Sequence, residues 1–313
     1  MTFHSLSNVS EVDKFDGKVI ALGCFDGFHL GHREVIISAV ELAKSIGAEP
    51  AVFCFDIPPA CYSTFSTVKI LDGGDRLQLF ADAGIKSVYI ADFLQIKDMD
   101  AGQFIDSLLI GECSARGVVC GFNFKFGRGR SGTPELLKQY FGNNAITLDP
   151  VYYGDSPISS SRIRAALADG DVELSAKLLG RHYSLNAPVI SGRQDGRKLG
   201  FPTLNQIPDH SRAIPASGVY VTLTTMPNRE VFPSITDVGL APTLDKSGII
   251  RFETHILDKY IDYTPNEIKV EFLARIREER HFGSFDELKA QIRSDSDFAR
   301  QYFSKINNNE SNS

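Results

Sequence analysis

Short apolar runs alternate with amphipathic stretches through the first half of the chain. Residues 18–24 form an apolar run that ends in a glycine-rich turn, and residues 33–46 repeat apolar side chains at helical spacing up to a stop at Gly47. Similar runs at 51–55, 87–91 and 117–121 alternate with helical patterns at 101–113 and from Thr133-Pro134 onward. The alternation predicts an α/β domain: a parallel sheet covered by helices, with ligands at the carboxyl ends of its strands.

The pattern changes after His182. A helical connector at 159–180, broken at Gly170, leads into alternating strands at 218–225, 249–258 and 267–276, with turn signals between them. Ser284 and Glu287 have capping-box spacing, which predicts a closing helix to about residue 303 and a frayed polar tail from residue 306. We therefore predict a second domain, a small antiparallel β-barrel with a closing helix, and boundaries of 1–182 and 183–313.

Composition and charge exclude some classes of binding partner. The 313 residues carry a formal net charge of -6 without a basic run, which argues against a nucleic-acid partner. No signal pattern and no apolar run of membrane-spanning length is present, so we expect a cytoplasmic protein without a membrane partner; the oligomeric state stays open. Five cysteines without C-x-x-C spacing are interpreted as small core residues: Cys24, Cys54, Cys61, Cys113 and Cys120.

The first chemical motif lies between the first strand and the first helix. Residues 23–32 read Gly-Cys-Phe-Asp-Gly-Phe-His-Leu-Gly-His. Gly23 and Gly27 permit a tight turn close to a ligand, and His29 and His32 share one face at a helix start, where phosphate binds favourably. Two histidines alone would be incidental, but the strand–glycine–helix setting favours a phosphate site. A zinc site is a further interpretation, although the pair lacks obvious additional ligands.

This motif resembles the H-x-G-H nucleotidyltransferase superfamily, whose members transfer a nucleotidyl group from a nucleoside triphosphate. Residues 158–164, Ile-Ser-Ser-Ser-Arg-Ile-Arg, are similar to a second signature of that superfamily, and residues 121–127, Gly-Phe-Asn-Phe-Lys-Phe-Gly, resemble its FMN adenylyltransferase branch. Taken alone, the two segments would be a serine cap with surface arginines and a basic glycine loop. The resemblance implies a Rossmann-like domain with a flavin contact at Asn123 and ATP contacts at Gly23, Phe25, Asp26, Gly27, His29, His32, Ser160, Ser161 and Arg162.

A second chemical motif lies in the second half. Residues 192–205 read Gly-Arg-Gln-Asp-Gly-Arg-Lys-Leu-Gly-Phe-Pro-Thr-Leu-Asn, in which glycines allow the backbone to wrap phosphates. Thr203 and Asn205 offer hard oxygen ligands suited to Mg²⁺. In the strand at 251–257, alternation places Glu253 on the polar face, where its carboxylate could accept the proton of an attacking hydroxyl. The alternatives without a functional role are a charged hairpin for residues 192–205 and a solvent-facing strand for residues 251–257.

Gly-Phe-Pro-Thr-x-Asn resembles the riboflavin kinase signature, and Glu-Thr-His-Ile matches the strand that carries its catalytic base. The resemblance implies Glu253 as the base, flavin contacts at Arg277 and Glu279, Mg²⁺ at Thr203 and Asn205, and ATP contacts at Gly192, Lys198, Gly200, Thr203 and Asn205. The matches span roughly residues 19–303 in one order, so the chain is similar to the bifunctional riboflavin kinase/FMN adenylyltransferases of bacteria. Such enzymes phosphorylate riboflavin with ATP and then transfer AMP from ATP to FMN, giving FAD and pyrophosphate.

Three departures from that family remain. The Phe-x-Pro-His-Pro segment reads Phe-Asp-Ile-Pro-Pro here, with Pro58 at the histidine position. Asn-Ile-Gly-x-x-Pro-Thr becomes Asp-Val-Gly-Leu-Ala-Pro-Thr from Asp237 onward, and the Asp-Leu-Tyr-Gly turn becomes Asp-Tyr-Thr-Pro at 262–265. Two alternatives stay open: a riboflavin kinase with a degenerate first domain, and a non-catalytic flavin-binding regulator, which would be expected to lose Glu253 or the histidine pair first.

Overall fold

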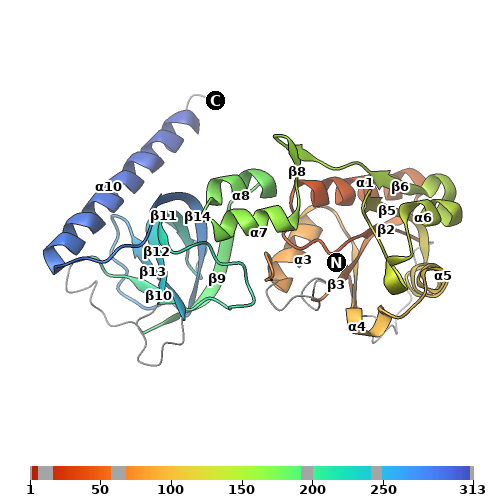
Figure 1. The fold of residues 1–313 in the computed structure, drawn as a ribbon, viewed down its shortest axis with the longest axis horizontal. Helices are drawn as coiled ribbons and strands as arrows, with labels where there is room; N and C mark the ends of the chain where they lie inside the picture. The colour runs from red at the N-terminus through yellow and green to blue at the C-terminus, as the bar shows by residue number, and fades with distance from the viewer. Residues whose placement is uncertain (1, 6–16, 58–67, 192–199, 241–248, 311–313) are drawn as a thin grey trace. The chain divides into compact units, whose positions relative to one another are not determined.

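The computed structural model describes residues 2–5, 17–57, 68–191, 200–240 and 249–310 (Figure 1). The chain folds as two compact units, Met1–Ser160 and Ser161–Ser313. Pro58 and Pro59, together with Gly192 and Lys198, lie outside the described residues.

The first unit is built on a parallel sheet, as the alternation predicted. Its six described strands have the order β1-β4-β3-β2-β5-β6, and every neighbouring pair is parallel. The strands are β1 (Thr2–Ser5), β2 (Lys18–Leu22), β3 (Glu49–Phe55), β4 (Ser87–Ala91), β5 (Ala115–Gly121) and β6 (Ala145–Leu148). Because the chain moves outward from β2 in one direction and then returns to place β5 on its other side, the connections reverse between β2 and β5.

Helices cover both faces of this sheet. Their bounds are α1 (Leu30–Ile46), α3 (Gly73–Asp82), α4 (Phe93–Ile96), α5 (Ala101–Gln103), η1 (Phe104–Glu112), η2 (Arg128–Arg130), α6 (Pro134–Phe141) and η3 (Gly142–Asn144). Alternate residues of β2 enter two separate cores. Val19 and Ala21 pack with α1 and α3, whereas Ile20 and Leu22 pack with η1 and α6. A small hairpin of β7 (Tyr152–Tyr153) and β8 (Ser156–Pro157) follows.

Local sequence signals set several helix ends. Gly47 ends α1 in the left-handed conformation at φ 67°, as predicted. Thr133 precedes Pro134 at the start of α6, but its side chain makes no capping hydrogen bond there. The helix predicted over 101–113 is α5 followed by the nine-residue π-helix η1. Its wider turns appear in the bond from the Cys113 amide to the Leu108 carbonyl, 2.9 Å, which spans five residues.

Three of the five cysteines lie in the core of this unit, as interpreted from their apolar surroundings: Cys54, Cys113 and Cys120 are buried and free. Burial raises the pKa of the Cys54 and Cys120 thiols to about 11. Both thiols therefore stay protonated near neutral pH and behave as small apolar groups. Cys24 is half-buried, and Cys61 lies outside the described residues.

The second unit opens with two helices and closes into a barrel. The helices α7 (Ser160–Ala168) and α8 (Val172–Leu179) are separated at Gly170, where φ is 77°, as predicted. The closed antiparallel barrel has the order β10-β13-β12-β11-β14-β9. Its strands are β9 (Tyr183–Ile190), β10 (Leu204–Gln206), β11 (Gly218–Thr225), β12 (Val231–Leu240), β13 (Ile250–Ile256) and β14 (Glu267–Arg277).

The barrel interior contains a row of hydroxyl groups as well as apolar side chains. Thr222 Oγ1 lies 2.8 Å from Ser234 Oγ and 2.9 Å from Thr236 Oγ1, and all three side chains are fully buried. Thr224 joins Ser234 at 2.7 Å, and Thr254 joins Thr236 at 3.0 Å. Ser234 Oγ also donates to the Thr222 carbonyl at 3.0 Å. Each buried hydroxyl in the row is thereby hydrogen-bonded, as burial requires.

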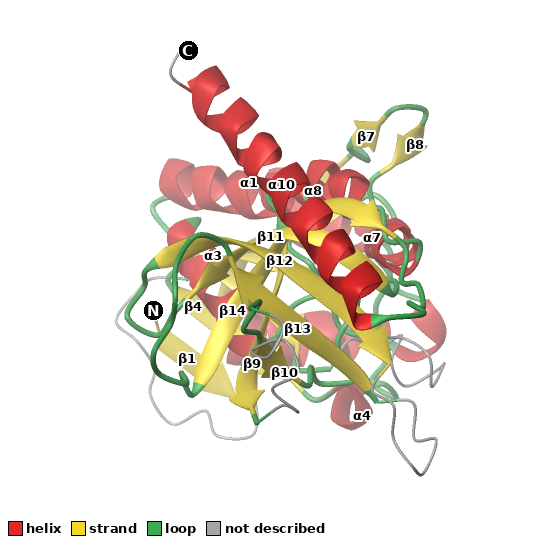
Figure 2. Ribbon diagram, turned by 90° about the vertical axis from the view of Figure 1, so that its left-hand side faces the viewer, coloured by secondary structure: helices red, strands yellow, loops and turns green. Residues whose placement is uncertain are grey.

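The closing helix α10 (Phe285–Glu310) lies across the outside of the barrel (Figure 2). Ala299 packs there with Val219, Val221, Ile235 and Leu273, which point outward from β11, β12 and β14. Ser284 Oγ accepts from the Glu287 amide at 3.2 Å, as a capping box requires, but the Glu287 carboxylate accepts from the Gly283 amide instead. The helix continues to Glu310, beyond the end predicted near residue 303.

Candidate functional sites

The two motifs of the first unit meet at one edge of its sheet. The loop containing His29 follows β2, and the segment containing Asn123 follows β5, the neighbouring parallel strand. The connections reverse between these strands, and crevices at such reversals are where ligands of open α/β sheets bind. Asn123 is exposed there. The predicted flavin contact therefore lies at the same sheet edge as the predicted ATP motif.

The loop after β2 has an unusual backbone that two phenylalanines hold in place. Phe25 and Phe28 have φ values of 51° and 44°, in the left-handed backbone region that residues other than glycine rarely adopt. Both rings are buried and make edge contacts with Phe80 of α3 at 5.7 Å between centroids. A Cβ at Gly23 would lie 2.9 Å from the Phe25 ring, so glycine is required for this packing. Phe25 thus shapes the loop from inside.

His29 and His32 lie together at the start of α1. His29 is the N-cap residue, and its Nδ1 accepts from the His32 amide at 3.2 Å. The two rings stack with centroids 3.6 Å apart and planes at 16°. His29 is 7% exposed. The pair places two imidazoles at a helix N-terminus, where the helix dipole favours a phosphate group.

Asp26 connects the loop to two other segments. Its carboxylate is 4% exposed and accepts from the Ile70 and Leu71 amides at 2.9 and 3.4 Å. Its carbonyl accepts from Ser160 Oγ at 2.7 Å, so the second predicted signature reaches the first across 134 positions. Ser161, which is exposed, and Arg162, half-buried, follow in α7. The Asp26 contacts stabilise the loop; its predicted contact with ATP stays a prediction.

Arg76 of α3 was missed by the sequence analysis. Its guanidinium is buried and donates through Nη1 to the carbonyls of Phe55, at 2.9 Å, and Cys24, at 3.4 Å. These carbonyls end β3 and begin the loop after β2. An arginine in an amphipathic helix usually points to solvent, so only the structure places this one under the loop.

In the second unit, strand pairing places the predicted kinase residues in one row. Asn205 of β10 pairs with Glu253 of β13, which pairs in turn with Asp237 of β12. Alternation along β13 buries Phe252, Thr254 and Ile256 in the interior, as predicted, and leaves Glu253 on the outer face with 48% of its side chain exposed. Asn205 Nδ2 lies 3.4 Å from Thr203 Oγ1. Thr203, Asn205 and Glu253 therefore form one group of oxygen-bearing side chains.

Two titratable residues, His255 and Asp237, lie next to this group. His255 Nδ1 lies 2.9 Å from the Pro202 carbonyl, and its ring meets Phe201 edge-on at 5.4 Å, which holds the segment after Gly200 against β13. Because a carbonyl only accepts, Nδ1 is the donor; burial lowers the pKa of His255 and keeps its imidazole neutral. Burial, followed by the charge of Glu279, raises the pKa of Asp237 to about 7. Asp237 was noted in the sequence only as a departure from the family pattern.

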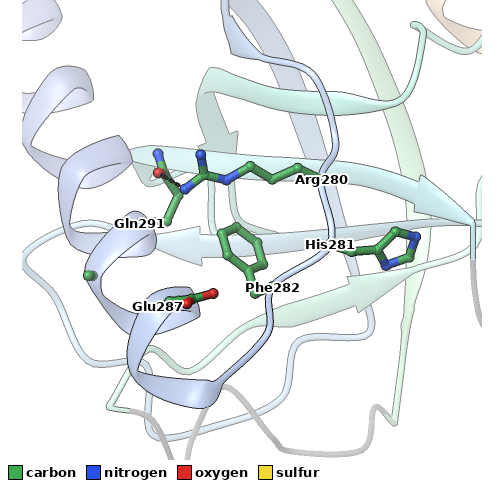
Figure 3. A pocket seen from close by; sticks show the side chains of 6 residues that line it. Arg280, His281, Phe282, Glu287 and Gln291 are labelled. Atoms are coloured by element: carbon green, nitrogen blue, oxygen red, sulfur yellow. Dashed lines mark hydrogen bonds between the residues drawn. The ribbon is translucent and has the colours of Figure 1, made fainter.

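The predicted flavin contacts lie at the end of β14, where Arg277 is its last residue and Glu279 follows two positions later. Arg277 is half-buried and makes a two-pronged bond to Asp295 of α10, with its Nη2 2.9 Å and its Nε 3.1 Å from Oδ2. The Glu279 carboxylate approaches Gly239 so closely that a Cβ there would lie 2.8 Å from it. An open pocket of about 460 Å³ lies next to Arg277, whose Cζ is 5.7 Å from the centre of the ring of Phe282, a residue that lines it (Figure 3). It is lined by Arg280, His281, Phe282, Glu287, Ala290 and Gln291.

The described residues contain neither a metal-binding cluster of acidic, histidine and cysteine side chains nor a membrane-spanning helix. Within them, no group of three or more His, Cys, Asp and Glu side chains is placed to hold a metal ion, so the zinc interpretation of the histidine pair gains no support. In the same part of the chain, the helices include none with the length and hydropathy needed to cross a membrane.

Comparison with known proteins identifies the family. The FAD synthetase model matches residues 12–162, and the riboflavin kinase model matches residues 179–303. A bifunctional riboflavin kinase/FMN adenylyltransferase of Bacillus subtilis is 33% identical over 298 residues, covering 92% of this chain and 93% of the relative. The protein of the same name in Escherichia coli K12 is 31% identical over 309 residues, 96% of each chain.

A solved structure extends the likeness to the fold. A Streptococcus pneumoniae crystal structure, described as a macrolide-efflux protein, superposes with a TM-score of 0.87 at 30% identity over 96% of this chain and 99% of that one. Both family models, in the expected order, and both relatives cover nearly the whole chain. The chain therefore belongs to the bifunctional riboflavin kinase/FMN adenylyltransferase family.

Proposed function

We propose that this enzyme of FAD biosynthesis uses Glu253 to phosphorylate riboflavin and the His29/His32 pair to adenylylate FMN. The row of Asn205, Glu253 and Asp237 on the outer side of the barrel strands carries the first assignment, because the half-exposed Glu253 carboxylate lies opposite Asn205, the last residue of the predicted phosphate-binding segment. The stacked histidines at the start of α1 carry the second. ATP, riboflavin and FMN are the substrates.

In the kinase reaction, a hydroxyl of riboflavin attacks the γ-phosphorus of ATP and must lose a proton. Glu253 has an exposed carboxylate that can accept it, and Arg251 lies 4.0 Å away. Thr203 and Asn205 are in contact, with Asn205 Nδ2 3.4 Å from Thr203 Oγ1; their hydroxyl and amide groups each carry a hard oxygen of the kind that fits Mg²⁺ and would hold it beside the phosphates. When bound, Mg²⁺ neutralises phosphate charge. Arg277, whose Cζ lies 5.7 Å from the centre of the Phe282 ring, and Glu279 would contact the flavin.

In the adenylylation reaction, the nucleophile is a phosphate oxygen of FMN that is already anionic. This step needs positioning and charge stabilisation rather than a base. His29 and His32 donate hydrogen bonds at the helix start as charge moves onto the departing pyrophosphate. Ser160, held against the loop through Asp26, would bind the triphosphate, with FMN beside Asn123.

The chemistry of the two sites favours two activities over the alternatives. A degenerate first domain would not need the strained loop that buries Phe25 and Phe28 beneath the histidines. A non-catalytic regulator would not need Glu253 in line with Asn205. The free cysteines of the described residues agree with a reducing compartment, and we place the enzyme in the cytoplasm.

One assay separates these possibilities. Purified protein is incubated with riboflavin, ATP and Mg²⁺, and riboflavin, FMN and FAD are separated over time. We expect FMN to appear first and FAD to follow. FMN without FAD would indicate a kinase alone, and unchanged riboflavin would indicate a binding protein.

A further inference from the structure

The guanidinium of Arg76 is buried without an ionic partner. Arg76 is 5% exposed, and no carboxylate of the described residues lies within 4.0 Å of its nitrogens. Its hydrogen bonds go to two backbone carbonyls, of Cys24 and Phe55, and its buried Nε has no acceptor in the described part of the chain. A buried charge costs stability unless an opposite charge compensates it, so this arginine calls for a counter-ion.

The position of Arg76 indicates where that counter-ion binds. Its two carbonyl acceptors lie at the carboxyl ends of β2 and β3, directly before the loop that leads to His29. Phe80, one turn further along α3, contacts Phe25 and Phe28 of the same loop. The loop in turn gives its Asp26 carboxylate to the amides of Ile70 and Leu71. The segment from Ile70 to Phe80 therefore packs against the buried side of the phosphate-binding loop and supports it.

We infer that Arg76 is a positioning residue for adenylylation: it fixes the loop after β2 and places a permanent positive charge beneath the phosphates of the bound substrate. This inference rests on the proposed function of the first unit. Arg76 acts from the interior side of the loop and does not touch the reacting atoms. Its charge acts through a low-dielectric interior, where screening by water is weak. The anionic ligand, bound above the loop, offsets the cost of burying the guanidinium.

The test separates charge from packing. Arg76→Met removes the charge and both hydrogen bonds, Arg76→Gln removes the charge but keeps amide donors, and Arg76→Lys keeps the charge. Arg116→Met is the matched control, because Arg116 is exposed at the amino end of β5, on the opposite edge of the sheet. FAD formation from FMN and ATP, and its reversal with inorganic pyrophosphate, are measured together with riboflavin phosphorylation as an internal reference. Thermal unfolding without ligand reports the fold.

We expect the KM values for ATP and pyrophosphate in the adenylylation reaction to rise about tenfold or more in Arg76→Met and Arg76→Gln, and to change less than about threefold in Arg76→Lys. Riboflavin phosphorylation and the Arg116→Met kinetics should stay at wild-type values. The unfolding midpoint of ligand-free Arg76→Met should equal or exceed the wild-type midpoint, because an uncompensated buried charge has gone.

Wild-type KM values in Arg76→Gln would overturn the inference, as would a Lys variant impaired as strongly as the Met variant. If Arg76→Met does not fold, the comparison of Arg76→Gln with Arg76→Lys decides. A wild-type protein that forms no FAD would refute the proposed function instead. Calorimetric titration with pyrophosphate would then still test Arg76: weaker binding in the Gln variant than in the Lys variant supports its role, and equal binding refutes it.

Discussion

Asp237 makes the stability of the barrel depend on pH. Its carboxylate lies opposite Glu253 in the β12–β13 pair, and its buried Oδ1 has no hydrogen-bond partner among the described residues. Burial is the largest cause that raises its pKa from 3.8 to about 7, and Glu279, Glu253 and Asp295 raise it further. The opposing cation, Arg277, is bound to Asp295. The folded protein therefore holds a proton on Asp237 that the unfolded chain releases at lower pH.

The magnitude follows from the difference between the two pKa values. The folded value of about 7 lies about three units above the unfolded value of 3.8, and each unit corresponds to about 1.4 kcal/mol. Asp237 should therefore cost about 4 kcal/mol of folding stability above pH 7, where it is ionised in both states. The cost should diminish as the pH falls from about 7 towards 4, and disappear below 3.8. Asp237→Asn removes the titration.

The prediction is checked by urea unfolding, followed by far-UV circular dichroism and by amide hydrogen exchange in β12, between pH 5 and 8. The stability advantage of Asp237→Asn over wild type should grow by about 1.4 kcal/mol per pH unit from pH 5 towards pH 7 and level off above pH 7. Asp262→Asn, at an exposed position, should show no such trend. Parallel stability curves for wild type and Asp237→Asn would refute the reasoning.

Three further predictions concern the two sites and the unit boundary. Glu253→Gln should lower riboflavin phosphorylation by about 10²–10⁴ while FAD formation from added FMN survives; equal loss in both assays would count against a specific role. His29→Ala and His32→Ala should each lower FAD formation by about 10²–10³ and leave FMN formation intact, which product separation over time would show. A fragment from residue 161 should unfold at a higher temperature than one from residue 183, because α8 packs on β14 and β9; equal melting temperatures of two active fragments would contradict this.

Strands with a clear sequence pattern were predicted correctly, whereas strands with no local sequence signal were missed. β4 and β11 have the predicted bounds, because alternation or continuous burial marks their residues. β10 has only three residues, and β12 contains Pro233, which argues against a strand when the sequence is taken alone. The closing helix is longer than expected because polar residues such as those at 307–310 can continue a helix that packing has already started.

The candidate sites likewise contain residues that motifs identify and residues that only the fold brings to the site. The motifs located His29, His32 and Glu253, but they could not reveal which side chains lie beside them. Asp237 stands next to Glu253 only through antiparallel register between β12 and β13, a long-range property. Arg76 binds two carbonyls from other segments, and carbonyls are the same at every position of a sequence. Contacts made by the backbone are thus the part of a site that motifs leave out.

The hydroxyl row inside the barrel has a direction. Ser234 has one hydrogen, and it goes to the Thr222 carbonyl, so Thr222 and Thr224 must both donate to Ser234. The hydrogen of Thr222 is then used, which obliges Thr236 to donate to Thr222 and Thr254 to donate to Thr236. One carbonyl thus orders the protons of five side chains on three neighbouring strands. Replacing Ser234 with alanine would remove the acceptor at which this polarity ends and leave two orientations of the remaining chain open.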